Sequence, residues 1–424
     1  MDRSRVRAWL MYDWANSAFA TTVVAAVLPV FYTEVAAAEL PGHLATTYWG
    51  YAQAAALFLI AVMAPVLGAI ADLSGNKMFF LRLFSWTGII ATLAFAFVGP
   101  GDYLFCLLVL VVATVGFSGA NAFYDALLPD LVPEARRDYV SSLGYAVGYI
   151  GGGLLLVANL IMIQKPGWFG LPDALAATRA VFVTVSFWWL LFALPLFVRV
   201  RDERRRPALS LAGYARTGFR RIAETARGVS RYPELAKYLA AYWLFSDGIN
   251  TVIRMAVVYG AEVGIGSSDL IVALVVTQFV GIPCTVLFGK IAEKYGPKRS
   301  LYVSLSIYTL IVSLGYFMTT AAHFYALAFM VGVVQGGSQA VARSLFSRLV
   351  PDEREAEFFG FFAVSGKLSA VFGPLLFSTA ALLTGSGRSG IFSLVAFFVL
   401  GIALLARVDL AKGAREAGRA AAET

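Results

Sequence analysis

The stretch Gly68-Ala-Ile-Ala-Asp72-Leu-Ser-Gly75-Asn-Lys77 returns 221 residues later as Gly289-Lys-Ile-Ala-Glu293-Lys-Tyr-Gly296-Pro-Lys298-Arg299. Glycine, acid, glycine and base keep the same spacing in both copies, and each copy joins two apolar runs. A second element, Leu-Val-Pro, follows an apolar run at residues 131–133 and again at 349–351. Duplication on this scale in an apolar chain indicates a membrane protein built from two related halves.

Composition supports a membrane protein. The 424 residues are 59% hydrophobic and 14% charged, whereas soluble domains carry roughly 25% charged residues. Because a helix needs about 20 apolar residues to cross a bilayer, the apolar runs predict twelve membrane-spanning helices at residues 9–36, 47–71, 78–98, 103–128, 141–163, 178–198, 236–261, 268–292, 299–319, 322–346, 357–383 and 388–407. The predicted fold is all-α, with two pseudo-symmetric six-helix bundles.

The repeat also predicts the domain organisation. We expect a first bundle at 1–198, a cytoplasmic linker at 199–235, a second bundle at 236–407 and a cytoplasmic tail at 408–424. The linker pattern favours an amphipathic surface helix, the alternative being a flexible basic linker. Within the spans, Gly373-Pro374 predicts a kink, and the glycines of span 5 predict close helix packing: Gly144, Gly148, Gly151, Gly152 and Gly153.

Basic residues predict the orientation. With both termini inside, 28 of the 34 Lys and Arg residues fall on the cytoplasmic side and 3 on the outside. This is the positive-inside pattern. The net charge of +8 is therefore a topology signal, and we expect no nucleic-acid partner. The two cysteines lie inside apolar runs and are interpreted as small hydrophobic residues.

The duplicated loop resembles the signature loop of the major facilitator superfamily, which joins spans 2 and 3 and spans 8 and 9. Residues 12–19 (Tyr-Asp-Trp-Ala-Asn-Ser-Ala-Phe) and 246–251 (Ser-Asp-Gly-Ile-Asn-Thr) are similar to motifs of its vacuole-effluxer-like branch. The first loop departs from the family pattern at Leu73, where a base is common. The resemblance implies a transporter with alternating access, whose spans 1, 4, 7 and 10 line a central cavity. Fungal members are associated with amino-acid efflux.

The resemblance also implies a gating role for charged residues near the cytoplasmic helix ends. In the family the loop acid caps a helix of the other half and pairs with nearby bases; the bland alternative is a solvated turn. Pseudo-symmetry adds an acid and a base at matched positions of spans 4 and 10, and span 1 adds an Asp-x-x-Asn pair. The expected gating residues are Asp72, Lys77, Glu293, Lys298, Arg299, Asp125, Arg343, Asp13 and Asn16. Trp9 and Trp14 are expected to anchor span 1 at the membrane interface.

Polar residues deep within spans predict the solute site, because charges there are costly and usually face water or one another. In span 7, Asp247, Asn250, Thr251 and Arg254 are expected on one stripe, which touches solute or a coupling proton; an internal Asp–Arg pair is the alternative. Lys367 of span 11 is expected to pair with Asp247 or to bind an anionic group. Asn121 and Gln339 are matched positions of spans 4 and 10 and complete the predicted set.

The sequence shows no Walker loop, zinc cluster or nucleophile elbow, so we expect neither an enzyme nor a cofactor. The leading hypothesis is a secondary transporter of a small polar solute, such as an amino acid, coupled to protons. An exporter of amphipathic compounds on the same fold is the alternative, and a non-transporting membrane sensor is a third. We expect a monomer in the bacterial inner membrane.

Overall fold

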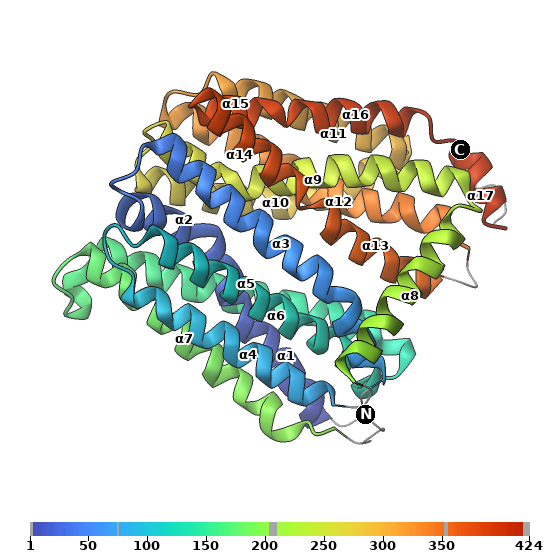
Figure 1. Cartoon of the computed structure of the whole chain (residues 1–424), viewed down its shortest axis with the longest axis horizontal. Helices are drawn as coiled ribbons and strands as arrows, with labels where there is room; N and C mark the ends of the chain where they lie inside the picture. The colour runs from blue at the N-terminus through green and yellow to red at the C-terminus, as the bar shows by residue number, and fades with distance from the viewer. Residues whose placement is uncertain (1–2, 74–75, 203–209, 352–354, 419–424) are drawn as a thin grey trace. The chain divides into compact units, whose positions relative to one another are not determined.

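The computed structural model describes residues 3–73, 76–202, 210–351 and 355–418, and it leaves some side chains inside helices undescribed. Contacts divide the chain into two compact units: Met1–Glu39 with Val62–Phe219 (unit 1), and Leu40–Ala61 with Arg220–Thr424 (unit 2). The described part is helical and contains no strand (Figure 1). Each of the twelve apolar runs identified in the sequence is helical.

Unit 1 begins with a helix of mixed geometry. Helix α1 (Arg3–Ala18) continues through π-helical turns over Phe19–Val27, a short α2 (Leu28–Phe31) and further π-helical turns over Tyr32–Ala36. The other helices are α4 (Lys77–Ala94), α5 (Tyr103–Leu131), α6 (Glu134–Gln164) and α7 (Ala174–Arg199), together with the second half of α3 (Gly42–Leu73) and the first half of α8 (Leu211–Val229), which continues into unit 2 from Arg220. Helix α4 packs on α5, and α1 packs on α6 and α7.

Unit 2 contains the first half of α3 and the chain from Arg220 onward. Its helices are α9 (Pro233–Glu262), α10 (Ser267–Tyr295), α11 (Pro297–Tyr316), α12 (Ala321–Leu349), α13 (Glu355–Ser369), α14 (Phe372–Thr384), α15 (Gly387–Ser393), α16 (Val395–Ala406) and α17 (Leu410–Glu416). Helix α10 packs on α12, and α9 packs on α16, as the neighbouring ribbons of Figure 1 show.

Nine helical stretches of the described chain are long and apolar enough to cross a membrane. The helices that correspond to expected spans 5, 7 and 9 are α6, α9 and α11, and they are not among these nine. Helix α9 carries Asp247 and Arg254 within its length, which lowers its hydropathy. The all-helical membrane class is confirmed, and the count of twelve crossings stays a prediction.

Three local expectations are confirmed. Helices α5 and α12 end at Leu131 and Leu349, immediately before the repeated Val-Pro pairs. Span 11 is broken rather than continuous, because α13 ends at Ser369 and α14 begins at Phe372, directly before Gly373-Pro374. The linker contains helix α8, as its amphipathic pattern predicted.

The glycine stripe of α6 lies against α1, as expected for close packing. A Cβ atom on Gly144 would lie 2.8 Å from Asp13 Oδ2, and one on Gly151 would lie 2.6 Å from the Trp14 ring. Similar clashes would arise at Gly148 and Gly152, whereas Gly153 faces open space. Four of the five glycines therefore let two helices approach more closely than any side chain would allow.

Candidate solute site

A buried carboxylate lies where span 11 breaks. Asp247 of α9 is 1% exposed, and the Thr251 hydroxyl, one turn further, donates to its Oδ1 atom over 3.4 Å. The backbone N–H of Gly373, in the first turn of α14, also donates to this carboxylate. The first backbone N–H groups of a helix have no partner within the helix, so an acid placed there is stabilised by hydrogen bonds and by the helix dipole.

Glycine is required at this contact. A Cβ atom on Gly373 would lie 2.5 Å from Asp247 Oδ1, a distance that real Cβ atoms do not show. The break itself is buried: Ala370 and Val371 pack with Ala54 and Leu57 from the first half of α3. Asp247 Oδ2 is buried and has no hydrogen-bond partner among the described residues. One carboxylate oxygen is thus held in place and the other is unsatisfied.

The expected stripe on α9 divides into two environments. Asp247 and Thr251 face the break in span 11, whereas Asn250 donates to Ser246 over 3.4 Å and lines a separate pocket. The physical reason is helical geometry, since neighbouring residues 250 and 251 point about 100° apart at 3.6 residues per turn. Arg254 lies in neither environment, because it bonds to Gln53 of α3.

Arg254 is tied to the first half of α3. Its Nη1 donates to Oε1 of the buried Gln53 over 3.3 Å, and Trp49 Nε1 donates to the Arg254 carbonyl over 3.3 Å. Gly50 lets the same half of α3 approach α14, since a Cβ there would collide with the Ser378 side chain. The guanidinium therefore bonds to a neutral amide of α3, and its attraction to Asp247 acts through space.

The pocket beside Asn250 brings together three residues that the sequence analysis singled out. Asn250, Gln339 and Arg343 line an open pocket of about 430 Å³ between α9, α12 and α13. The other lining residues are Tyr242, Phe245, Ser246, Ile249, Ser338, Ala342, Phe359, Phe362 and Ala363. Sequence reasoning missed the aromatic members; their i, i+3 and i, i+4 spacing on α9 and α13 was the available signal. Arg343 was expected as a gating residue and here faces the pocket.

Lys367 lies on α13 and is exposed. It is not among the residues that line the pocket, and the contacts of Asp247 involve Thr251, Gly373 and Arg254 instead. The expected pairing of Lys367 with Asp247 stays a prediction.

Unit 1 brings together other predicted residues. Asn16 of α1 is buried, and its Nδ2 donates to Asn121 Oδ1 of α5 over 2.5 Å. Asp13, one turn earlier, lies against Gly144 of α6. Spans 1 and 4 are thus joined by a polar contact within one bundle.

Trp9 is not an interface anchor. It is 3% exposed, it stacks on Tyr124 at 4.4 Å, and its Nε1 donates to the Tyr124 carbonyl over 3.1 Å. Trp14 is half-buried and stacks on Trp188 at 5.8 Å. Both indole rings pack between helices because α1 contacts α5 and α7 along this face.

The bases of the two loop motifs bond to helix ends of their own unit. Lys77 Nζ donates to Asp130 and to the Ala126 carbonyl at the end of α5, both over 2.7 Å. Its counterpart Lys298 donates to the Val408 carbonyl over 2.6 Å. Arg299 is exposed. The side chains of Asp72 and Glu293 lie outside the described residues, so their gating role stays a prediction.

Asp125 of α5 and Arg343 of α12 are both exposed, and they belong to different units. The contact expected between these two residues stays a prediction.

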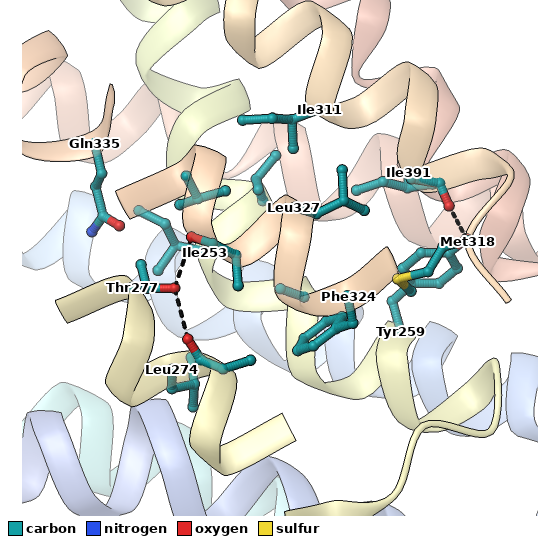
Figure 2. A pocket seen from close by; sticks show the side chains of 16 residues that line it. Ile253, Tyr259, Leu274, Thr277, Ile311, Met318, Phe324, Leu327, Gln335 and Ile391 are labelled. Atoms are coloured by element: carbon teal, nitrogen blue, oxygen red, sulfur yellow. Dashed lines mark hydrogen bonds between the residues drawn. The ribbon is translucent and has the colours of Figure 1, made fainter. Parts of the chain in front are cut away.

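A second cavity in unit 2 is of a different kind. It measures about 90 Å³ and lies among α9, α10, α11 and α12, lined almost wholly by aliphatic and aromatic side chains (Figure 2). The Thr277 hydroxyl on its wall already bonds to the carbonyls of Ala273 and Ala328. A polar solute would find few partners here, so the pocket at Arg343 is the better candidate for solute.

The fold is that of transporters. A D-xylose–proton symporter superimposes with a TM-score of 0.67 over 96% of this chain and 97% of its own, at 15% identity. A nucleoside transporter, NupG, gives 0.63 at 13% identity over 95% of this chain and 99% of its own. A bacterial homologue of the lysosomal transporter Spinster gives 0.60 at 17% identity, covering 96% and 97%. At these identities the likeness shows the fold alone.

The sequence pattern described as "Vacuole effluxer Atg22 like" matches residues 43–418, and the chain belongs to this family of the major facilitator superfamily. An uncharacterized MFS-type transporter, YxiO of Bacillus subtilis (strain 168), is 38% identical over 406 residues, which are 95% of this chain and 94% of the relative. Autophagy-related protein 22 of Yarrowia lipolytica is 26% identical over 309 residues, covering 66% of this chain and 51% of the fungal protein.

Proposed function

We propose that this MFS-type transporter moves a small polar solute by alternating access and couples the movement to protons through Asp247. The observation that carries the proposal is the half-satisfied, buried carboxylate at the broken span 11, beside the polar pocket of Asn250, Gln339 and Arg343. Ionisable groups buried in a membrane protein usually belong to solute or proton pathways. The resemblance to a proton symporter in fold is consistent with such coupling.

The neutral and charged forms of Asp247 would have different partners. The charged form is stabilised by the Gly373 N–H and by the start of α14, while the neutral form removes the cost of burying a charge. A proton that binds and leaves at this position would therefore change how tightly α9 holds α14. Such a two-state contact can link protonation to helix movement.

We further propose twelve membrane crossings, with both termini cytoplasmic in a bacterial inner membrane. The support is the distribution of Lys and Arg, which places 28 of 34 on one side. Amino acids are the first solutes to test, because the chain belongs to the vacuole-effluxer-like family.

Purified protein in proteoliposomes tests the coupling. With an imposed pH gradient, the wild type is expected to accumulate a solute from an amino-acid panel above its equilibrium level. Asp247→Asn is expected to abolish accumulation while solute exchange across the membrane continues. Asp173→Asn is the matched control, because Asp173 is the exposed N-cap of α7 and asparagine caps equally well. Unchanged accumulation in Asp247→Asn would refute the coupling role.

An exporter of amphipathic compounds is the second candidate, and the aromatic wall of the pocket favours it. Tyr242 and Phe362 face each other at 4.2 Å, and Phe359 lies beneath Arg343. Overexpression should then raise resistance to aromatic toxic compounds, and Phe362→Ala should remove that gain. Unchanged resistance would count against this function.

A further inference from the structure

We infer that the pocket of α9, α12 and α13 selects organic anions, specifically a carboxylate attached to an apolar or aromatic body, over amines and neutral amides. This inference rests on the proposed transport function and specifies its solute class. It depends on the charge, the hydrogen-bonding groups and the shape of the pocket.

Charge is the first argument. Among the twelve described residues that line the cavity, Arg343 is the one that carries a charge. None of the ion pairs between described side chains involves Arg343, and its guanidinium rests 5.7 Å from the centroid of the Phe359 ring. Arginine presents a planar fork of donors that matches the two oxygens of a carboxylate. The pocket therefore offers a cation that an anionic solute can neutralise.

Neutral polar groups also line the pocket, one on α9 and one on α12, the helix that carries Arg343. Asn250 uses an amide hydrogen toward Ser246, which leaves its carbonyl oxygen and a second hydrogen for a solute. Gln339, one turn before Arg343 on α12, is exposed and lines the same cavity. These amides can orient a polar end group without adding charge.

The remaining wall suits a flat apolar body. Phe362 packs between Tyr242 at 4.2 Å and Phe346 at 4.3 Å, and Phe245 meets Tyr242 edge to face at 5.5 Å. The cavity of about 430 Å³ falls within the range of roughly 300–1,000 Å³ that small-molecule sites occupy. An aromatic or branched acid could stack here while its carboxylate reaches Arg343.

An ammonium group gains less in this pocket. The carboxylate expected to receive it, Asp247, faces Gly373 and Thr251 and does not line the cavity. An amino acid therefore finds a partner for its carboxylate but no acid for its amine in the described lining. The inference is thus narrower than amino-acid binding, because it assigns recognition to the carboxylate end.

The inference can be tested with four compounds that share a phenylethyl group and differ in the charge of the end group: 3-phenylpropionate, phenylalanine, phenethylamine and 3-phenylpropionamide. Affinities for the full-length protein in detergent would be measured by isothermal titration. We expect 3-phenylpropionate to bind at least tenfold more tightly than its amide, and phenethylamine to bind most weakly. Arg343→Gln should lower the affinity for the acid to that for the amide and leave the amide unchanged, while Arg343→Lys should keep part of the preference. Arg348→Gln, another exposed arginine of α12 outside the pocket, is the matched control.

Equal affinity for acid and amide, tighter binding of the amine, no binding of the acid, or an unaltered preference in Arg343→Gln would each overturn the inference. The transport assay keeps the two proposals apart. If a pH gradient drives another solute while the acid shows no preference, the inference fails and proton-coupled transport stands. If the acid binds through Arg343 but no solute follows a pH gradient, the inference stands and proton coupling fails.

Discussion

Asp247 of α9 accepts a hydrogen bond from the backbone N–H of Gly373, in the first turn of α14. Two features of the chain meet in this contact: the buried acid of span 7 and the break of span 11. The break exposes backbone donors that an intact helix would use internally, and the acid satisfies one of them. The contact therefore depends on a residue without a side chain at position 373.

Gly373→Ala is expected to disrupt proton-driven accumulation at least tenfold, because the added Cβ would lie 2.5 Å from Asp247 Oδ1 and displace the carboxylate. Accumulation in proteoliposomes under a pH gradient measures the effect. Gly153→Ala is the control, since a Cβ at Gly153 meets nothing within 4 Å. Wild-type accumulation in Gly373→Ala would contradict the proposed importance of the contact.

The C-terminal segment after α16 bonds to α9 through Glu234. This carboxylate is 1% exposed, it accepts from Lys237 over 2.8 Å and from the Asp409 backbone N–H over 2.9 Å, and Lys412 lies 3.4 Å away. Burial alone would raise the pKa of Glu234, but the hydrogen bonds outweigh it, and the pKa lies below its ordinary value of 4.5.

Because the folded pKa is depressed, the stabilisation from Glu234 is fully present above pH 4.5 and is lost as the pH falls through the folded pKa. Glu234→Gln should lower the free energy of unfolding at pH 7 by about 1–3 kcal/mol. It should also reduce the loss of stability that the wild type shows as the pH falls. Thermal unfolding in detergent across pH measures both effects. Glu224→Gln, in an exposed pair with Arg220, should change stability by about 0–1 kcal/mol. Equal effects of the two variants would contradict the assignment.

The bond between Asn16 and Asn121 should couple spans 1 and 4. A double-mutant cycle with Asn16→Ala and Asn121→Ala is expected to give a coupling energy of about 0.6 kcal/mol, typical of hydrogen bonds between membrane helices. Unfolding in detergent provides the free energies. A parallel cycle of Asn16→Ala with Thr178→Ala, a half-buried residue whose hydroxyl bonds within α7, should be additive. Additivity in the first cycle would show that the bond contributes nothing measurable.

Helix α8 should detach from α3 when Gly218 gains a side chain. A Cβ on Gly218 would collide with the Pro65 carbonyl, and Tyr214 is buried on the same face. Gly218→Val is therefore expected to speed trypsin cleavage after the exposed Arg220 and Arg221 several-fold. Gly167→Val, where a Cβ meets nothing within 4 Å, is the control. Unchanged cleavage in Gly218→Val would show that this contact does not hold α8.

Much of the fold was predictable because hydropathy and repeats report on helices one at a time. The twelve helical segments, the linker helix and the break near Gly373-Pro374 follow from local composition and from backbone rules for glycine and proline. The π-helical turns at Phe19–Val27 carried no such signal, since the sequence there reads as an ordinary apolar helix.

The candidate site was predictable only in part. Polar residues within apolar runs are conspicuous, so Asp247 and Asn250 were predicted for the solute site and Arg343 for gating. Which of them line the same pocket depends on the neighbouring helices, because Arg254 bonds to Gln53 of α3 and Asp247 bonds to Gly373 of α14. The aromatic wall was missed because phenylalanine is as suitable for lipid or core as for a pocket.

The amino-acid sequence by itself determined the membrane class, the duplication, the approximate positions of the helices and the position of the broken span, because these depend on the hydropathy and backbone preferences of short segments. Only the tertiary structure decided that one oxygen of Asp247 is bonded and the other is not, that Arg343 faces a pocket while Lys367 does not, and that the first half of α3 packs with unit 2. Those outcomes depend on contacts between residues far apart in the chain, and helical periodicity defines the face of a helix but not the partner that covers it.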